Sequence, residues 1–434
     1  MHQLTTKDAR FWAKLHQALG PLHQSNAPTE AVAEILSAVK KEGDQAVARF
    51  AAKFDRVDCS PGDFRVPVER LRTAFRNLSP EIKDALRQSH AGVEAFHQAA
   101  KPKNWTIRNP HGALVGERFY PLQRVGLYIP GGQVPLVSTV IMTATLARLA
   151  KVPEVAVFTP PGRDGWPDDA LLGALHYLGI QEVYRLGGVQ AMGAMAYGTE
   201  SIPAVRKIFG PGNAYVVEAK RQLYGTVGID LLPGPSEVMV IADESARPDW
   251  VAADLLSQAE HGPGGIIFLV TTSTAQRTAI NQEVRRQMKG AGHLEILQKV
   301  MGEGYFAIVA HTPEAIIEVA NRIAPEHLEL MVERKLAIEL EKRITTAGAM
   351  LSGVWTPTAV GDFTAGPSHV LPTGSAGVFS SGLRIEDFYR RSSYVRYDRK
   401  SVRQAEPITS AFAAMENLPA HGASVRLRMG KKVR

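Results

Sequence analysis

The sequence predicts an α/β protein built on two parallel sheets, with a short helical arm before them and a small segment after them. Its 434 residues exceed what one hydrophobic core normally organises, and 45% of them are hydrophobic, an ordinary share for a folded protein. From Arg124 onward, short apolar runs alternate with amphipathic stretches, which is the pattern of β/α units. The same alternation begins again at Glu237, so we expect a second sheet.

The first series contains four expected strands. They are RVGLYIP (124–130), EVAVFTP (154–160), EVYRLG (182–187) and VRKIFG (205–210). The expected helices between and after them span 136–151, 168–178, 189–197 and 216–225.

The second series contains five expected strands. They are 237–243, 265–271, 305–310, 327–333 and 349–353. Helices are expected over 249–261, in a stretch ending at Met288, and over 312–324. Thr312 is a typical N-cap residue and Pro313 suits the first helical position, so the third of these helices has a clear start.

The two ends of the chain have a different pattern. Residues 1–24 predict a short helical arm, and the chain from Arg384 is basic and poor in apolar residues, with a last helix over 401–418 stopped by Pro419. No residue-level repeat supports a duplication. The expected domains are 1–24, 25–127 together with 235–383, 128–234, and 384–434.

Composition excludes several classes of protein. The single cysteine, Cys59, excludes an intramolecular disulfide and suits the cytoplasm, so a zinc site would need His, carboxylate and amide ligands. The start of the chain lacks a secretory pattern, and the least polar stretch, 134–150, is interrupted by polar residues, so we expect no membrane segment. The net charge of +7 is small for 50 basic and 43 acidic residues. We therefore expect a solvated surface that attracts anions, and no nucleic-acid binding.

Three glycine-rich segments follow expected strands, where open α/β sheets bind ligands. They are 127–135, 186–195 and 210–215. The last lacks the third glycine of a dinucleotide fingerprint, so a phosphate site at a helix start and a plain tight turn both remain open.

Several polar groups have the spacing or the loop setting of a functional site. Gln258 and His261 share one helix face, although a pair of this kind is more often surface decoration or a capped helix end than a ligand pair. Glu326 and His327 lie at a helix-to-strand junction, where a general acid or base can be partly desolvated, but such neighbours are common. The remaining candidates lie on loops rich in glycine and proline: Asp362, His369, Glu416 and His421.

Read in order, these segments resemble the histidinol dehydrogenase family over nearly the whole chain. The matching blocks are VGLYIPGG, GGVQA, FGPGNAYVVEAKR, GPSEVMVIAD, AADLLSQAEHGP, NRIAPEHLEL, GDFTAGPSHVLPT and ENLPAHG. The resemblance implies two incomplete Rossmann-like domains and a C-terminal segment that mediates dimerisation.

The resemblance also implies a site, residue by residue. One Zn²⁺ per subunit would be held by Gln258, His261, Asp362 and His421. Glu326 and His327 would be the catalytic pair. The substrate contacts would be Ser236, Gln258, His261, His327, Asp362, Glu416 and His421. The NAD contacts would be Tyr128, Gln190 and Asn213.

The implied reaction is the oxidation of L-histidinol through bound L-histidinal to L-histidine with two NAD, in the cytoplasm. His327 would take the hydroxyl proton, and Glu326 would help to deprotonate the attacking water. Glu416 favours an imidazole-bearing substrate over the sulfonated diol of a relative, because a carboxylate can accept a hydrogen bond from the imidazole ring. The implied enzyme is a homodimer with shared active sites, in which the segment from Arg384 docks on the other subunit.

Overall fold

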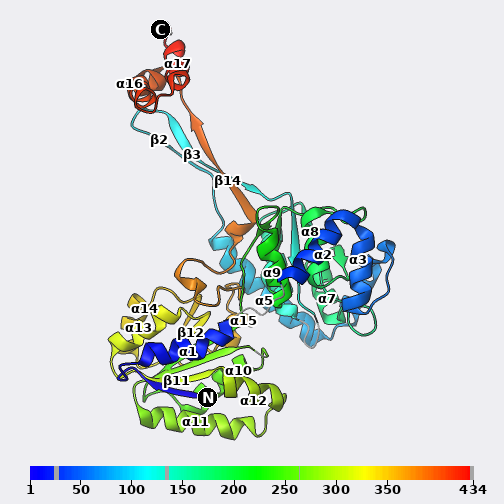
Figure 1. Cartoon of the computed structure of the whole chain (residues 1–434), viewed down its shortest axis with the longest axis vertical. Coiled ribbons are helices and arrows are strands. Elements are labelled where there is room, and N and C mark those ends of the chain that lie inside the picture. Colours follow the sequence, from blue (N-terminus) through cyan, green and yellow to red (C-terminus); the bar gives the residue numbers. More distant parts are fainter. Residues whose placement is uncertain (24–28, 132–135, 263, 431–434) are drawn as a thin grey trace.

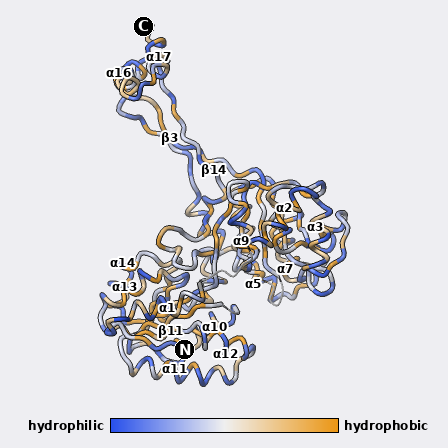
Figure 2. The backbone as a smooth tube through the Cα atoms, viewed as in Figure 1, coloured by the Kyte–Doolittle hydropathy of each residue, from blue (hydrophilic) through white to orange (hydrophobic). Residues whose placement is uncertain are grey.

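A computed structural model gives the structure of the chain, and it describes residues 1–23, 29–131, 136–262 and 264–430. Figure 1 shows two bodies side by side and a thin arm that extends from them to the C-terminus. The hydrophobic segments are concentrated inside the two bodies (Figure 2). Within the described ranges, no helix has the length and apolar character needed to cross a membrane.

The first body is a six-stranded sheet whose strand pairs are all parallel. In spatial order its strands are β1 (His2–Thr5), β11 (Tyr305–Val309), β10 (Ile266–Thr271), β9 (Glu237–Ala242), β12 (His327–Met331) and β13 (Ala349–Ser352). The continuous apolar runs of the central strands suit a sheet covered on both faces.

Helices cover both faces of this sheet. One face buries α1 (Phe11–His23), α13 (Pro313–Ile323) and α14 (Arg334–Arg343), and the other buries α10 (Pro248–Ala259), α11 (Thr274–Met288) and α12 (Leu294–Glu303). The short α15 (Thr358–Phe363) follows β13. The N-terminal arm contains the expected helix, and it also contributes the edge strand β1 to the sheet.

The second body is a five-stranded parallel sheet in the order β6-β5-β4-β7-β8. Its strands are β4 (Arg124–Tyr128), β5 (Glu154–Phe158), β6 (Glu182–Tyr184), β7 (Lys207–Phe209) and β8 (Gly228–Ile229). If the strands of this sheet are numbered along the chain from β4, their spatial order is 3-2-1-4-5. The six-stranded sheet has the same order when its strands are numbered from β9 and the added edge strand β1 is left out. That order is the one found in Rossmann-type folds, so the predicted fold class is confirmed.

The helices of the second body come from two parts of the chain. One face is covered by α4 (Val68–Asn77), α5 (Pro80–Ala99), α6 (Val137–Leu149) and α7 (Asp169–Tyr177). The other is covered by α2 (Thr29–Glu42), α3 (Asp44–Phe50), α8 (Gly188–Tyr197) and α9 (Ala214–Leu223). A π-helical turn, η1 (Ala51–Asp55), and a 3-10 turn, η2 (Pro61–Asp63), follow α3.

This packing corrects the expected grouping of residues 25–127 with residues 235–383, which form the six-stranded sheet. Val32, Leu36 and Val47 are buried against the five-stranded sheet, so the helices of residues 29–99 belong with that body. The expected boundary between 127 and 128 also falls inside β4. The boundary expected at 24 lies outside the described residues, as do parts of the glycine-rich segment 127–135.

The thin arm that leads to the C-terminus in Figure 1, distinct from the N-terminal helical arm, contains a three-stranded antiparallel sheet that the sequence did not predict. β3 (Leu114–Pro121) lies between β2 (Trp105–Arg108) and β14 (Tyr389–Arg396). At its far end lie α16 (Arg399–Met415) and α17 (Pro419–Arg428). Two 3-10 turns, η3 (Ala376–Val378) and η4 (Ile385–Phe388), come before β14 in the chain. The last expected helix ends earlier than predicted, and Pro419 begins a further helix because proline suits the first helical position.

Candidate active site

Glu326 and His327 are held at the amino end of β12, which lies between β9 and the edge strand β13. Helix α13 ends at Ile323, and Ala324 adopts a left-handed conformation (φ 51°) that turns the chain into the strand. The backbone N–H of Glu237, the first residue of β9, donates a hydrogen bond to Glu326 Oε2 at 2.9 Å. His327 Nδ1 lies 3.4 Å from the carbonyl oxygen of the same Glu237. The expected helix-to-strand junction is therefore confirmed, and both side chains are anchored to the neighbouring strand.

Asp362 lies in α15 and points at the other side of the imidazole. Its Oδ1 is 3.4 Å from His327 Nε2. Burial would raise the pKa of Asp362, but His327 outweighs burial and lowers it, with smaller contributions from His369 and His261. These three histidines therefore surround one carboxylate, although they come from separate parts of the chain.

The electrostatics of Glu326 and His327 are unusual. Burial raises the pKa of Glu326 to about 7, and His327 partly opposes this shift. Burial alone would lower the pKa of His327, but the carboxylates of Asp362 and Glu326 raise it to about 9. The pKa of Glu326 is thus displaced toward neutral pH and that of His327 above it, and buried titratable neighbours with strongly displaced pKa values are typical of an acid/base site.

Gln258 carries the clearest sign of a missing ligand. Its side chain in α10 is 1% exposed, and neither Oε1 nor Nε2 has a hydrogen-bond partner. A buried amide without partners costs about 1–3 kcal/mol, so such a group is usually explained by a ligand or an ion. His261 follows the same helix, and burial lowers its pKa, which favours the neutral form that binds metals.

His369 joins this cluster to the second body. Its Nε2 lies 3.5 Å from Thr139 Oγ1, in the first turn of α6. That turn follows β4, so it lies at the carboxyl edge of the five-stranded sheet. Burial lowers the pKa of His369, and the charge of Asp362 opposes the shift. The amino edge of one sheet thus meets the carboxyl edge of the other.

The residues expected to contact NAD lie along that carboxyl edge. Tyr128 ends β4, and its hydroxyl accepts a hydrogen bond from the Gly188 N–H at 3.2 Å. Gln190 Nε2 donates to Asp55 Oδ2 at 3.1 Å. Asn213 caps α9 by accepting hydrogen bonds from the backbone of the next turn. Because β4 and β7 flank the point where the strand order reverses, this edge is where such sheets bind nucleotides.

Glu416 and His421 are not brought to the cluster within one chain. Glu416 caps α16 and His421 lies in α17, both exposed at the far end of the arm (Figure 1). Ser236 lies just before Glu237, which places it next to the strand that holds Glu326 and His327. Across the described ranges, no three His, Cys, Asp or Glu side chains form a group that would hold a metal.

Other polar residues of the site were missed by sequence reasoning. Glu237 anchors the catalytic pair through its backbone, which leaves no mark in the sequence. Asp55 accepts a hydrogen bond from the Gly187 N–H at 3.1 Å and holds Gln190, yet it lies in the short π-helical turn that continues α3, away from any motif of the sequence. Glu329 is fully buried in β12, and an acid in an otherwise apolar strand was a signal that could have identified it.

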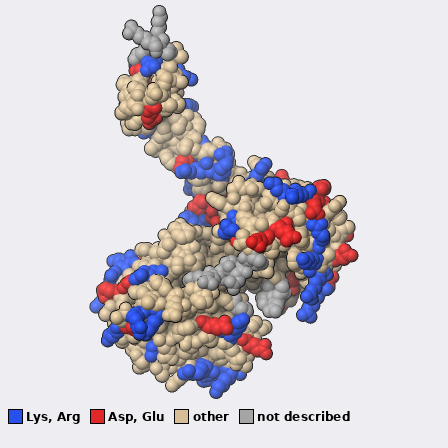
Figure 3. Space-filling model, viewed as in Figure 1, with Lys and Arg blue, Asp and Glu red and all other residues tan. Residues whose placement is uncertain are grey.

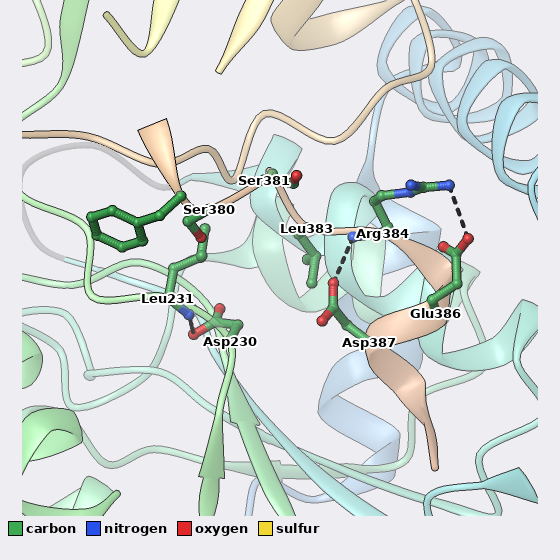
Figure 4. A pocket seen from close by; sticks show the side chains of 10 residues that line it. Asp230, Leu231, Ser380, Ser381, Leu383, Arg384, Glu386 and Asp387 are labelled. Carbon is green, nitrogen blue, oxygen red and sulfur yellow. Dashed lines mark hydrogen bonds and ion pairs between the residues drawn. The ribbon is translucent and has the colours of Figure 1, made fainter. Parts of the chain in front are cut away.

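A cavity of about 360 Å³ lies where the arm leaves the second body (Figure 4). It is lined by Asp230, Leu231 and residues 379–384, 386 and 387. None of the candidate site residues lines it. On the face drawn in Figure 3, Lys and Arg are interspersed with Asp and Glu over both bodies, as expected for a solvated surface.

Comparison with known proteins gives one consistent result. The sequence profile of the histidinol dehydrogenase family matches residues 21–429. Histidinol dehydrogenase of Synechococcus sp. is 43% identical over 397 residues, covering 92% of this chain and 91% of that protein. The enzyme of Moorella thermoacetica is 42% identical, covering 92% and 93%. The crystal structure of histidinol dehydrogenase from Elizabethkingia anophelis superposes with a TM-score of 0.94 at 32% identity, covering 99% and 98% of the two chains. This chain therefore belongs to the histidinol dehydrogenase family.

Proposed function

We propose that the chain is an NAD-dependent dehydrogenase that oxidises L-histidinol, by way of bound L-histidinal, to L-histidine, the last step of histidine biosynthesis. Family membership supports the reaction class. One observation carries the assignment of the site: His369 meets Thr139, so the cluster around Glu326, His327 and Asp362 adjoins the edge expected to bind NAD. A hydride donor and its acceptor must lie in contact, and this arrangement offers them adjoining sites.

The residues present suit one Zn²⁺ per subunit. Gln258, His261 and Asp362 would be three ligands, and His421 from a second copy of the chain would be the fourth. A set of N and O donors without thiolate is compatible with zinc, and the unpartnered carboxamide of Gln258 supports a ligand at that position. When bound, the ion would orient the imidazole and amine of histidinol and polarise the reacting oxygen.

The two catalytic residues would move the protons. In the first oxidation, His327 takes the hydroxyl proton while a hydride passes from the carbinol carbon to NAD. In the second, Glu326 takes a proton from the water that adds to the aldehyde, and the hydrate gives a hydride to a second NAD as one of its hydroxyl protons is lost to solvent. Binding of a cation by Asp362 would weaken its pull on His327, which lowers the pKa of the imidazole toward the range where it accepts protons.

The other expected contacts surround this pair. Ser236 and Glu416 would bind substrate, together with His327 and the metal ligands. The carboxylate of Glu416 would accept a hydrogen bond from the substrate imidazole. Tyr128, Gln190 and Asn213 would bind NAD at the carboxyl edge of the second sheet.

We propose that the enzyme is a homodimer whose active sites are shared. Glu416 and His421 lie at the end of an arm, away from the cluster that they would complete (Figure 1). Apolar side chains are exposed on this end and beside Asp362, a pattern that favours docking of one copy on another. They are Ile408, Phe412, Met415 and Leu427 on the arm, and Trp355, Val360 and Phe363 near the cluster.

One assay tests the proposed function. The purified enzyme is supplied with L-histidinol and excess NAD, and the NADH formed per histidinol consumed is measured spectrophotometrically. We expect two NADH per histidinol, and loss of activity after treatment with a chelator that added Zn²⁺ reverses. No NADH, or one NADH with release of free aldehyde, would contradict the proposal.

A further inference from the structure

A second buried acid shares the strand face of His327. In β12, Leu328 and Leu330 pack toward α1 and α13, whereas Met331 packs toward α10. Successive side chains of a strand point to opposite faces, so His327 and Glu329 also point toward α10. Glu329 is 1% exposed, and its carboxylate must be satisfied from within the protein.

One oxygen of Glu329 is bound by the start of α15. Oε1 accepts a hydrogen bond from the Thr358 N–H and another from Thr358 Oγ1, each at 2.6 Å. Thr358 is the first residue of α15, and Asp362 lies four residues later on the same helix face. Glu329 therefore sets where this short helix begins and in which direction it presents Asp362.

The Glu329 carboxyl also lies against α10. No donor with a fixed hydrogen reaches Oε2, and the carboxyl of Asp254 in α10 is within hydrogen-bonding reach of the Glu329 carboxyl. Two ionised carboxylates cannot make this bond, so one proton is retained between them. Burial raises the pKa of both carboxyls, that of Asp254 to about 8, and the Thr358 hydrogen bonds partly oppose the shift on Glu329. Because two donors from Thr358 bind Glu329 Oε1 and favour an ionised Glu329, the shared proton is assigned to Asp254.

Asp254 completes a connection among three elements. It lies one helical turn before Gln258 in α10, so both side chains share a face. The hydrogen-bonded residues thus run from α10 through β12 to α15, and each lies close in sequence to a residue of the candidate site. Asp254 is one helical turn from Gln258, Glu329 is two strand residues from His327, and Thr358 is one helical turn from Asp362.

We propose that Asp254 and Glu329 are positioning residues, which hold Gln258, His327 and Asp362 in register through this hydrogen-bonded chain. The inference rests on the function proposed above for those three side chains. Ligands and bases on separate elements need such support, because a shift of about 1 Å can cost about 100-fold in rate.

Three variants test the proposal. Asp254→Leu removes the donor to Glu329 and leaves its oxygen unpaired. Asp254→Asn is the matched control, because its amide donates the same hydrogen bond, has nearly the same shape and carries no charge. Thr358→Val removes one hydroxyl bond with little change in shape, so it covers the case in which Asp254→Leu fails to fold.

We expect kcat for histidinol to fall about 10- to 100-fold in Asp254→Leu and about 3- to 10-fold in Thr358→Val. Asp254→Asn should stay within about 3-fold of the wild type. The KM for NAD should be unchanged in all three, because the candidate NAD residues lie on the other sheet. Full kcat in Asp254→Leu and Thr358→Val, or equal losses in Asp254→Asn and Asp254→Leu, would overturn the proposal.

Hydrogen exchange of the α15 backbone amides gives a readout that is independent of activity. Asp254→Leu and Thr358→Val should exchange faster over 358–363, and Asp254→Asn should match the wild type. If the wild type makes no NADH from histidinol, the proposed function fails, yet this exchange pattern still supports the positioning role. Slow exchange in both disruptive variants would overturn the positioning role and leave the proposed function untouched.

Discussion

Two differently damaged chains should restore activity to each other if the active site is shared. Glu326 is buried at the amino end of β12, whereas His421 is exposed in α17 at the far end of the arm. Strand β14 has eight residues, and at about 3.3 Å per residue it carries α16 and α17 about 26 Å outward. A ligand placed there is far better suited to a second copy than to its own cluster.

The perturbation combines Glu326→Gln in one chain with His421→Asn in the other. In a heterodimer with shared sites, one site receives both lesions and the other receives none. Random exchange of equal amounts gives half heterodimers, and each has one intact site of two. Recovery should therefore reach about a quarter of wild-type activity, starting from two nearly inactive parents.

The assay is NADH production from histidinol after subunit exchange, with heterodimers quantified by native mass spectrometry. Each variant incubated alone under the same conditions is the control, because it shows how much activity returns without mixing. Heterodimers that form in the expected amount but have no activity would show that His421 serves its own chain. The model of shared sites would then be wrong.

Three further predictions concern single residues. Glu326→Gln should reduce the rate of histidinal oxidation by about 100- to 10,000-fold, the usual magnitude of general-base catalysis, and should reduce the rate of histidinol oxidation less. Equal losses in separate assays of the two substrates would contradict the division of roles. His261→Asn should lower bound zinc well below one per subunit by elemental analysis, whereas His311→Asn, on an exposed loop, should retain it; full zinc in His261→Asn would remove that residue from the site. His97 is 1% exposed with both ring nitrogens unpartnered, and burial lowers its pKa to about 4. The unfolded chain therefore binds this proton more tightly, and stability should fall by about 2 kcal/mol between pH 7.5 and 5. His97→Leu should abolish that part of the pH dependence of the urea midpoint, and an unchanged slope would refute the reasoning.

Much of the fold could be predicted because buried parallel strands are continuous apolar runs. EVMVIA and IIFLVT are such runs, and they form β9 and β10. The strands of the arm escaped prediction for the opposite reason. All four residues of WTIR in β2 are exposed, so the strand has no buried face, and its alternation of apolar and polar residues covers only four positions. The helices of residues 29–99 were detectable, because Val32, Ile35, Leu36 and Val39 follow helical spacing, but their partner sheet was not.

The site could be predicted only in part for a related reason. The spacing predicted Gln258 and His261 on one helix face, but α10 ends at Ala259 and His261 lies in the turn after it. The predicted helix-to-strand junction at Glu326 and His327 is present. The 3.4 Å contact between His327 and Asp362 depends on how α15 docks beside β12, which no local pattern encodes. Only the resemblance to a family brought Asp362 and His421 into the same set as the others.

The two sheets share a strand order but present opposite edges to the site. The five-stranded sheet offers its carboxyl edge, where β4 and β7 diverge and the candidate NAD residues lie. The six-stranded sheet offers its amino edge, where Glu237 and His327 begin β9 and β12. An amino edge exposes backbone N–H groups, and one of them, from Glu237, holds the Glu326 carboxylate. The same strand order would thus supply, in the proposed enzyme, a nucleotide-binding edge from one sheet and an acid/base edge from the other. Because the two edges would carry different chemistry, the side chains along them need not match.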